Sequence, residues 1–153
     1  MNISEINKPF NYINNINSGK TRDKICNILN LWYNIKSIDI QKIKNISNII
    51  HTSSLIIDDI EDNSFRRRGK ECSHIKYGLP LSLNSAYFSI FKLMSNLDEK
   101  TNYYIIKCLN KLHSGQGLDI LWTNNNYPTN AVTSTNGGGT LNARGHRFWA
   151  QFS

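Results

Sequence analysis

The sequence predicts an all-α fold. In four segments, apolar residues recur at spacings of three and four, which is typical of helices that bury one face. In no segment do apolar and polar residues alternate over the length of a strand. The chain has 153 residues, which fits one domain with a modest core.

The first part of the chain is expected to contain two long helices. Residues up to about 18 are rich in asparagine and are expected to form mainly loop, with one short helical piece. A helix is predicted from residue 20 to about residue 35, where the apolar residues at helical spacing are Ile25, Ile28, Leu29 and Trp32. The next helix is expected to begin at Ser37 or Asp39, either of which can cap an N-terminus, and to run into an acidic cluster.

Two further helices are predicted after a long connection over residues 63–80. Residues 82–95 are expected to form a buried helix, and another begins near Asp98 and continues through YYIIKCLNKLHSGQGLDILW. The composition then changes, because residues 124–153 lack Ile, Lys, Asp and Glu, whereas all 11 acidic residues lie before them. This last segment is expected to be an irregular, disordered tail that is foreign to the helical part.

The charge of the chain favours acidic partners. The net charge is +7 and the isoelectric point is about 9.4, which suits nucleic acid, an anionic membrane surface or phosphorylated small molecules. The basic residues of the first 123 positions are interspersed with the acids, which argues against a basic arm that binds nucleic acid. We therefore expect no nucleic-acid partner.

Cysteine usage and hydropathy point to the cytoplasm. Cys26, Cys72 and Cys108 are far apart and form no CxxC pair, which predicts free thiols in a reducing compartment. The start of the sequence has no apolar core of signal-peptide length, and no stretch is long enough to span a membrane. A cytoplasmic protein without a transmembrane segment is expected.

The segment LIIDDIEDNSFRRRGK places four acids within five residues and three arginines shortly after them. On a helix, Asp58 and Asp62 lie on one face, where like charges repel by roughly 0.2–0.5 kcal/mol. A divalent cation bound to both carboxylates would make their interaction favourable. Mg²⁺ prefers carboxylate, water and phosphate oxygens as ligands. His51 and Ser54 share this face, and Arg67 and Arg68 can fold back toward the acids. The pattern suits a diphosphate bound with a metal ion.

Other interpretations of these residues remain open at the level of spacing. Acids followed by arginines can be a surface network of salt bridges. A calcium loop is not expected, because the alternating oxygen ligands and central glycine are missing. His74 and His113 could suggest zinc together with the cysteines, but no ligand spacing supports such a site.

The spacing D-D-x-x-D followed by R-R-R-G resembles the trans-isoprenyl diphosphate synthases, the polyprenyl synthetase family, and most closely the eukaryotic geranylgeranyl diphosphate synthases. Four segments carry the resemblance in the right order: PFNYINNINSGKTR, HTSSLIIDDIEDNSFRRRG, IKYGLPLSLNSA and KLHSGQGLDILWTNNNYPT. It implies the N-terminal helices of an isoprenoid-synthase bundle. On this basis residues 1–129 form a partial polyprenyl synthetase domain, and residues 130–153 are an unrelated tail.

The resemblance implies a role for each residue of the motif. Asp58 and Asp62 would be the Mg²⁺ ligands, with Asp59 in support of catalysis. Arg67 matches the arginine that contacts the allylic diphosphate, and Arg68 matches the one that binds isopentenyl diphosphate. The remaining contacts to isopentenyl diphosphate would be Lys20, Arg22 and His51. The spacer between Lys20 and Arg22 is one residue shorter here than in the family.

The resemblance also bears on product length. Bulky aromatic residues just before the aspartate motif shorten the product pocket in this family, whereas Ser53 and Ser54 are small. A long pocket and a twenty-carbon product made from farnesyl diphosphate are therefore expected. A terpene cyclase is not favoured, because the arginine, lysine and histidine set points to a second diphosphate substrate.

The family's second aspartate-rich motif and its Lys-Thr pair do not occur in these 153 residues. The leading hypothesis is a prenyltransferase, and the alternative is a catalytically incomplete subunit that binds diphosphate or regulates a full-length synthase. Helices without their usual neighbours would also expose apolar faces, which predicts a homo-oligomer or association with a complete synthase.

Overall fold

The computed structural model describes residues 3–16 and 20–124. The chain divides into two compact units, residues 1–97 and residues 98–153. The predicted all-α class is confirmed, because nearly every described residue outside the connections is helical. None of the described helices is both long enough and apolar enough to cross a membrane.

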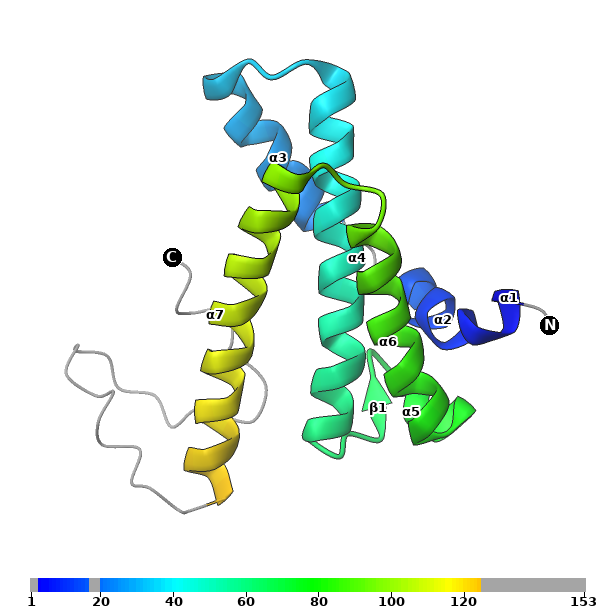
Figure 1. Cartoon of the computed structure of the whole chain (residues 1–153). Helices are drawn as coiled ribbons and strands as arrows, with labels where there is room; N and C mark the ends of the chain where they lie inside the picture. Colours follow the sequence, from blue (N-terminus) through cyan, green and yellow to red (C-terminus); the bar gives the residue numbers. More distant parts are fainter. Residues whose placement is uncertain (1–2, 17–19, 125–153) are drawn as a thin grey trace. The chain divides into compact units, whose positions relative to one another are not determined.

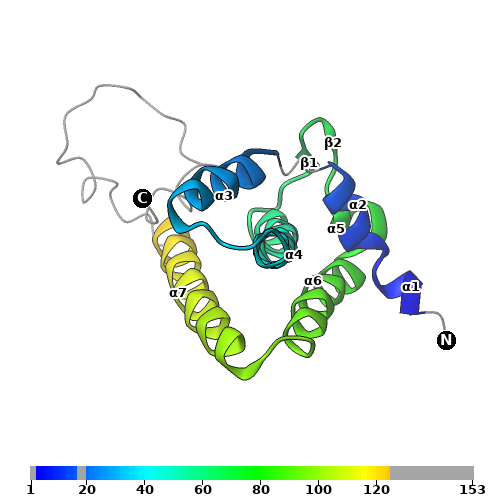
Figure 2. The same cartoon turned by 90° about the horizontal axis from the view of Figure 1, so that it is seen from above.

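The first unit is built around its longest helix. Its elements are α1 (Ile3–Ile6), α2 (Lys8–Ile16), α3 (Lys20–Tyr33), α4 (Ser37–Glu61), β1 (Arg66–Arg67), β2 (Lys70–Glu71), α5 (Ser73–Tyr77) and α6 (Leu79–Met94). Helix α4 contacts α2, α3, α5 and α6, and the view along its axis places it at the centre of this unit (Figures 1 and 2). The long helix that ends in the acidic cluster is thus the scaffold of the unit.

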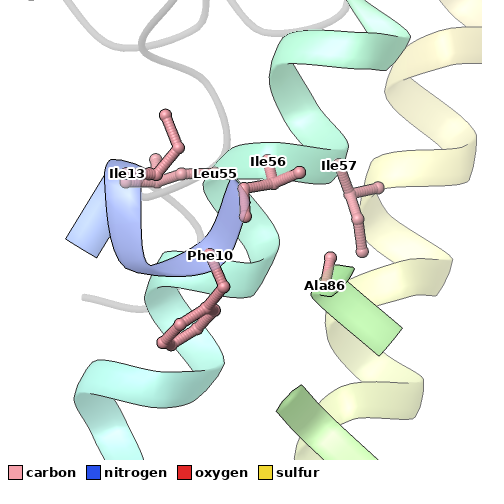
Figure 3. Close-up of a cluster of buried hydrophobic side chains, with 6 residues drawn as sticks. All are labelled: Phe10, Ile13, Leu55, Ile56, Ile57 and Ala86. Atoms are coloured by element: carbon pink, nitrogen blue, oxygen red, sulfur yellow. The ribbon is translucent and has the colours of Figure 1, made fainter. Parts of the chain in front are cut away.

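The core lies where α2 and α6 pack on the second half of α4. Its buried side chains are Phe10, Ile13, Leu55, Ile56, Ile57 and Ala86 (Figure 3). The Phe10 backbone N–H donates to the Ser85 hydroxyl at 3.2 Å, which fastens α2 to α6. The expectation that the first 18 residues are mainly loop is wrong, because two apolar residues one turn apart anchor a helix there despite the surrounding asparagines.

Helix α3 forms as predicted, but its apolar face is not buried. Ile25, Ile28 and Leu29 are each more than half exposed, and Trp32 is 88% exposed. The spacing of three and four therefore identified the helix without identifying a partner for it. Large exposed apolar side chains that lie together on one helix indicate a surface to which another protein chain can bind.

The junction between α3 and α4 differs from the expected capping. Lys36 is the N-cap residue of α4, and neither Ser37 nor Asp39 caps it, because both lie inside the helix. Asn30 closes the junction instead: its side chain accepts from the Ile35 N–H at 2.8 Å and donates to the Ile35 carbonyl at 3.1 Å. An asparagine side chain can replace both backbone partners in this way.

A short β-hairpin, with two residues in each strand, lies in the connection after α4, where no strand was expected. Arg66 pairs with Glu71 and Arg67 with Lys70, which leaves Arg68 and Gly69 as the turn. Both turn residues have positive φ, 51° and 80°, as a type I′ turn requires. Glycine adopts this backbone readily, whereas an arginine is held there at a cost.

The second unit contains α7 (Glu99–Asn124). Its predicted start near Asp98 is confirmed: one carboxylate oxygen accepts from the Thr101 N–H at 2.9 Å and the other from the Thr101 hydroxyl at 2.7 Å. The segment predicted to be irregular begins at residue 124, which is still the last residue of α7, and the rest of it, including the tail at 130–153, lies outside the described residues and stays a prediction.

Candidate functional site

The acidic cluster occupies the C-terminal end of α4. The last helical turn contains Asp58 and Asp59, and Asp62 is the C-cap residue, whose N–H donates to the Asp58 carbonyl at 2.9 Å. Neighbouring carboxylates here differ in environment, since the Asp59 side chain is 2% exposed and that of Asp58 is 36% exposed. The helix turn therefore sends Asp59 inward and leaves Asp58 at the surface of the unit.

Arg67 folds back onto this helix end as the sequence suggested. Its Nε donates to both Asp59 oxygens, at 3.0 and 2.8 Å, and its Nη2 lies 2.8 Å from Asp59 Oδ1 and 3.1 Å from Asp58 Oδ2. Burial opposes the charged form of Arg67, but the Asp59 hydrogen bonds and the two carboxylates outweigh it and raise the pKa of the guanidinium. Asp59 thus fixes the direction of Arg67.

Cys72 is a further partner of Asp59 that the sequence did not identify. The thiol is fully buried and hydrogen-bonds the Asp59 carboxylate. Burial, followed by the Asp59 charge, raises the pKa of Cys72 to about 12, so the sulfur stays protonated and donates. The backbone N–H groups of Cys72 and Ser64 bond to the carbonyls of Phe65 and Asp59, at 3.0 and 2.9 Å. These bonds fasten the hairpin to α4.

The pKa of His51 indicates that positive charge is concentrated next to the acidic cluster. Its pKa is lowered to about 4, first by burial and then by the charges of Arg22, Arg67 and Arg68. Three arginines from α3 and the hairpin therefore act on one imidazole of α4. The structure brings these four residues into one electrostatic neighbourhood, while Lys20 begins α3 and its side chain lies outside the described part of the chain.

Arg22 is held by a series of hydrogen bonds between neutral side chains, called the relay below, which consists of Asn48, Asn14 and Thr52. Its Nη2 donates to Asn48 Oδ1 at 3.0 Å, and Asn48 Nδ2 donates to Asn14 Oδ1 at 2.8 Å. The Thr52 hydroxyl donates to the same Asn14 oxygen at 3.3 Å. Burial lowers the pKa of Arg22, Asp23 opposes this effect and Arg68 adds to it. Sequence reasoning missed Asn14 and Asn48, because asparagine is common throughout the chain and neither residue stands out.

The two outward carboxylates fit a magnesium ion that shares its ligands with a phosphate. Burial, and next the charge of Asp62, raises the pKa of Asp58, so the Asp62 carboxylate disfavours the ionised form of Asp58. A divalent cation would relieve that repulsion. Among residues 3–16 and 20–124, no group of three or more His, Cys, Asp or Glu side chains forms a ready-made metal centre. Two carboxylates with waters and ligand oxygens match the way Mg²⁺ is bound in proteins.

The two serines before the aspartates have different surroundings. Ser53 is fully buried, whereas Ser54 is half-buried and its hydroxyl donates to the His51 carbonyl at 2.9 Å. Only Ser53 therefore places its small side chain in the interior of the first unit.

Comparison with known proteins identifies the family. Residues 3–135 match the polyprenyl synthetase family. The chain belongs to the polyprenyl synthetase family. The match includes every site residue considered above and ends six residues beyond the boundary expected at residue 129.

Individual relatives of the polyprenyl synthetase family agree with this assignment. The chain is 37% identical over 123 residues to a geranylgeranyl pyrophosphate synthase of Dictyostelium discoideum, a match that covers 78% of this chain and 41% of the relative. It is 38% identical over 121 residues to preaspterpenacid I synthase of Aspergillus terreus and 39% identical over 118 residues to quiannulatene synthase of Emericella variicolor. Both matches cover 74% of this chain, and 15% and 16% of those relatives. The chain thus spans less than half the length of each.

Proposed function

We propose that the chain contributes the diphosphate-binding face of a prenyltransferase that condenses an allylic diphosphate with isopentenyl diphosphate. The observation that carries the proposal is the shared environment of His51, Arg22, Arg67 and Arg68 beside an outward pair of carboxylates. Three guanidinium groups near one half-buried imidazole repel one another, and a bound polyanion would be attracted to all three.

The positions of the cations suit two diphosphates better than one. Arg67 contacts Asp58 and lies at the acidic end of α4, where a metal-bound allylic diphosphate would be held. The charge of Arg68 acts on Arg22, and both arginines act on His51, which supports a second anion site for isopentenyl diphosphate. We assign Lys20 to the same second site from the family resemblance alone.

Asp58 and Asp62 would hold Mg²⁺ together with the allylic diphosphate oxygens. When bound, this ion would neutralise charge on the leaving diphosphate. Asp59 has a different role on this proposal, because it is buried against Arg67 and supports catalysis by orienting that arginine.

The protein's own residues would act by placing fixed charge before the reaction begins. As the allylic C–O bond breaks, negative charge grows on the diphosphate, and a preorganised Arg67 stabilises it without rearrangement. Arg22, Arg68 and neutral His51 would hold isopentenyl diphosphate so that its double bond meets the allylic carbon. Loss of a proton from the new intermediate then completes the product.

Product length and cellular setting are finer parts of the proposal. The buried Ser53 leaves space before the aspartate motif, which supports a twenty-carbon product from farnesyl diphosphate. A cytoplasmic location is proposed from the three free cysteines. The exposed apolar face of α3 supports association with a second copy or with a complete synthase. The noncatalytic-subunit alternative is not favoured, because the named relatives are synthases.

A turnover assay tests the proposal. The purified chain is incubated with Mg²⁺, farnesyl diphosphate and labelled isopentenyl diphosphate, alongside Asp58→Ala and Asp39→Ala variants. Asp39 is an exposed acid in the first turn of the same helix, so its variant controls for the loss of one charge. We expect twenty-carbon product from the unmodified chain and from Asp39→Ala, and none from Asp58→Ala. Equal product from all three proteins would contradict the assigned metal ligands.

A further inference from the structure

Two arginines of the candidate site are held by acceptors of different charge. Arg67 is held by the carboxylates of Asp59 and Asp58, so much of its charge is compensated inside the protein. Arg22 instead donates to the neutral amide oxygen of Asn48. Within the described residues, the carboxylate that acts on Arg22 is the exposed Asp23 of the same helix, and solvent screens that interaction.

We propose that Asn48 is a positioning residue that holds Arg22 through a neutral acceptor, so that the guanidinium keeps its charge for an anionic ligand. The inference rests on the proposed function, in which that ligand is the diphosphate of the second substrate. It names two residues, Asn48 and Asn14, that would control the affinity of the site without contacting the ligand.

The direction of the relay supports this role. Asn14 Oδ1 accepts from two donors, Asn48 Nδ2 and Thr52 Oγ1. Because a guanidinium only donates, Arg22 requires the oxygen of Asn48, and the amide nitrogen of Asn48 is then turned toward Asn14 Oδ1. The opposite orientation would bring an amide N–H₂ against a guanidinium, two donors without an acceptor. Asn14 on α2 thus accepts the hydrogen bond that is left to the Asn48 amide on α4, and so supports the orientation in which Asn48 holds Arg22 on α3.

A carboxylate at position 48 would hold Arg22 at least as firmly but would cancel its charge. In Asn48→Asp the guanidinium gains a charge-assisted hydrogen bond, and the Asn14 amide can turn to donate to the new oxygen. Stability should therefore be kept while affinity for an anion falls. A residue with a merely structural role would lose both together, so the two properties separate the roles.

Isothermal titration with inorganic diphosphate, without added metal, measures the cationic site directly. We expect Asn48→Asp to weaken binding about tenfold or more, the loss of one charge-assisted contact, while the midpoint of thermal unfolding stays the same or rises. The matched control is Asn45→Asp, which adds the same charge at an exposed position of the same helix. We expect that variant to change affinity by less than about twofold.

Further variants make the relay itself measurable. Asn14→Ala removes the acceptor of the Asn48 amide and should weaken binding in the same direction. In an Arg22→Gln background, Asn48→Asp should weaken binding no more than Asn45→Asp does, because the partner of residue 48 has been removed.

The outcomes are distinguishable. Equal weakening by Asn48→Asp and Asn45→Asp would overturn the inference, because net charge alone would then explain the effect. Weakening of binding by Asn48→Asp together with a lowered unfolding midpoint would overturn it as well, in favour of a structural role. Failure of the unmodified chain to bind diphosphate would refute the proposed function, and the inference with it.

Discussion

Arg67 Nε donates to both carboxylate oxygens of Asp59, at 3.0 and 2.8 Å, and the acid is 2% exposed. A buried ion pair of this kind contributes little to stability as a pair, but removing one member leaves an uncompensated charge. Two adjacent aspartates of one motif thus have different environments, since Asp58 is 36% exposed.

Asp59→Asn should destabilise the fold by about 3 kcal/mol, because it leaves Arg67 without its buried counter-charge. The free energy of unfolding in urea measures this loss. Asp39→Asn, on the exposed first turn of α4, should cost less than about 1 kcal/mol. If both variants lost the same small amount, the buried pair would not anchor the hairpin.

Arg68→Asn should stabilise the hairpin and weaken diphosphate binding. Arg68 has φ of 51° in a type I′ turn, a position where asparagine is favoured. The change should raise the free energy of unfolding by about 0.5–1 kcal/mol, because asparagine accepts the left-handed backbone at lower cost. The control is Arg66→Asn, in β1 outside the turn, which should not raise stability. A loss of stability in Arg68→Asn would show that the arginine has compensating contacts.

Stability should fall as the solution is acidified from about pH 6.5 toward pH 4, in part through His51. Its folded pKa is lowered to about 4, by burial first and then by three arginines, so the unfolded chain binds the proton more readily in this window. The contribution of His51 is present above its ordinary pKa and is lost as pH falls toward 4. Unfolding curves at several pH values for the unmodified chain and for His51→Asn measure it.

The expected signature is a shallower acid dependence in His51→Asn. His113→Asn, at an exposed position of α7, controls for the replacement of a histidine by asparagine. Parallel slopes for all three proteins would mean that His51 titrates alike in the folded and unfolded states.

The three thiols should differ in reactivity in the native protein. Cys108 is exposed, Cys26 is half-buried and Cys72 is buried with its pKa raised to about 12, by burial and then by Asp59. Since the thiolate is the reactive form, Cys72 should be alkylated last and only on unfolding. Mass spectrometry of timed iodoacetamide reactions assigns each rate. Equal rates for Cys72 and Cys108 in the native protein would place the hairpin away from Asp59.

The sequence predicted the parts of the fold that depend on periodicity. Helices α3, α4, α6 and α7 are long enough for spacings of three and four to be recognised. One short helical piece was expected in the first 18 residues, but the extent of α2 was underestimated, because Phe10 and Ile13 stand among asparagines and one turn of apolar residues is too short to establish a period. The hairpin was missed for a related reason, since its paired strands have two residues each. Its turn also uses an arginine where asparagine or aspartate would signal a type I′ turn.

The charged residues of the candidate site could be predicted from the sequence. The acids of α4 and the arginines that follow stand out, and the structure places Arg22 and His51 with them. Residues that act through hydrogen bonds between neutral groups could not be predicted from the sequence. Asn14, Asn48 and the thiol of Cys72 carry no charge, and their partners are set by how three helices and a hairpin pack.

The most direct test of the central claim is the pKa of His51, followed by NMR of the imidazole with and without inorganic diphosphate. The account predicts a midpoint near pH 4 in the free protein, because burial and three arginines disfavour the imidazolium. It predicts a higher midpoint with diphosphate, whose negative charge offsets those arginines. An ordinary midpoint near 6.5 that diphosphate leaves unchanged would contradict a shared anion site of His51 and the three arginines.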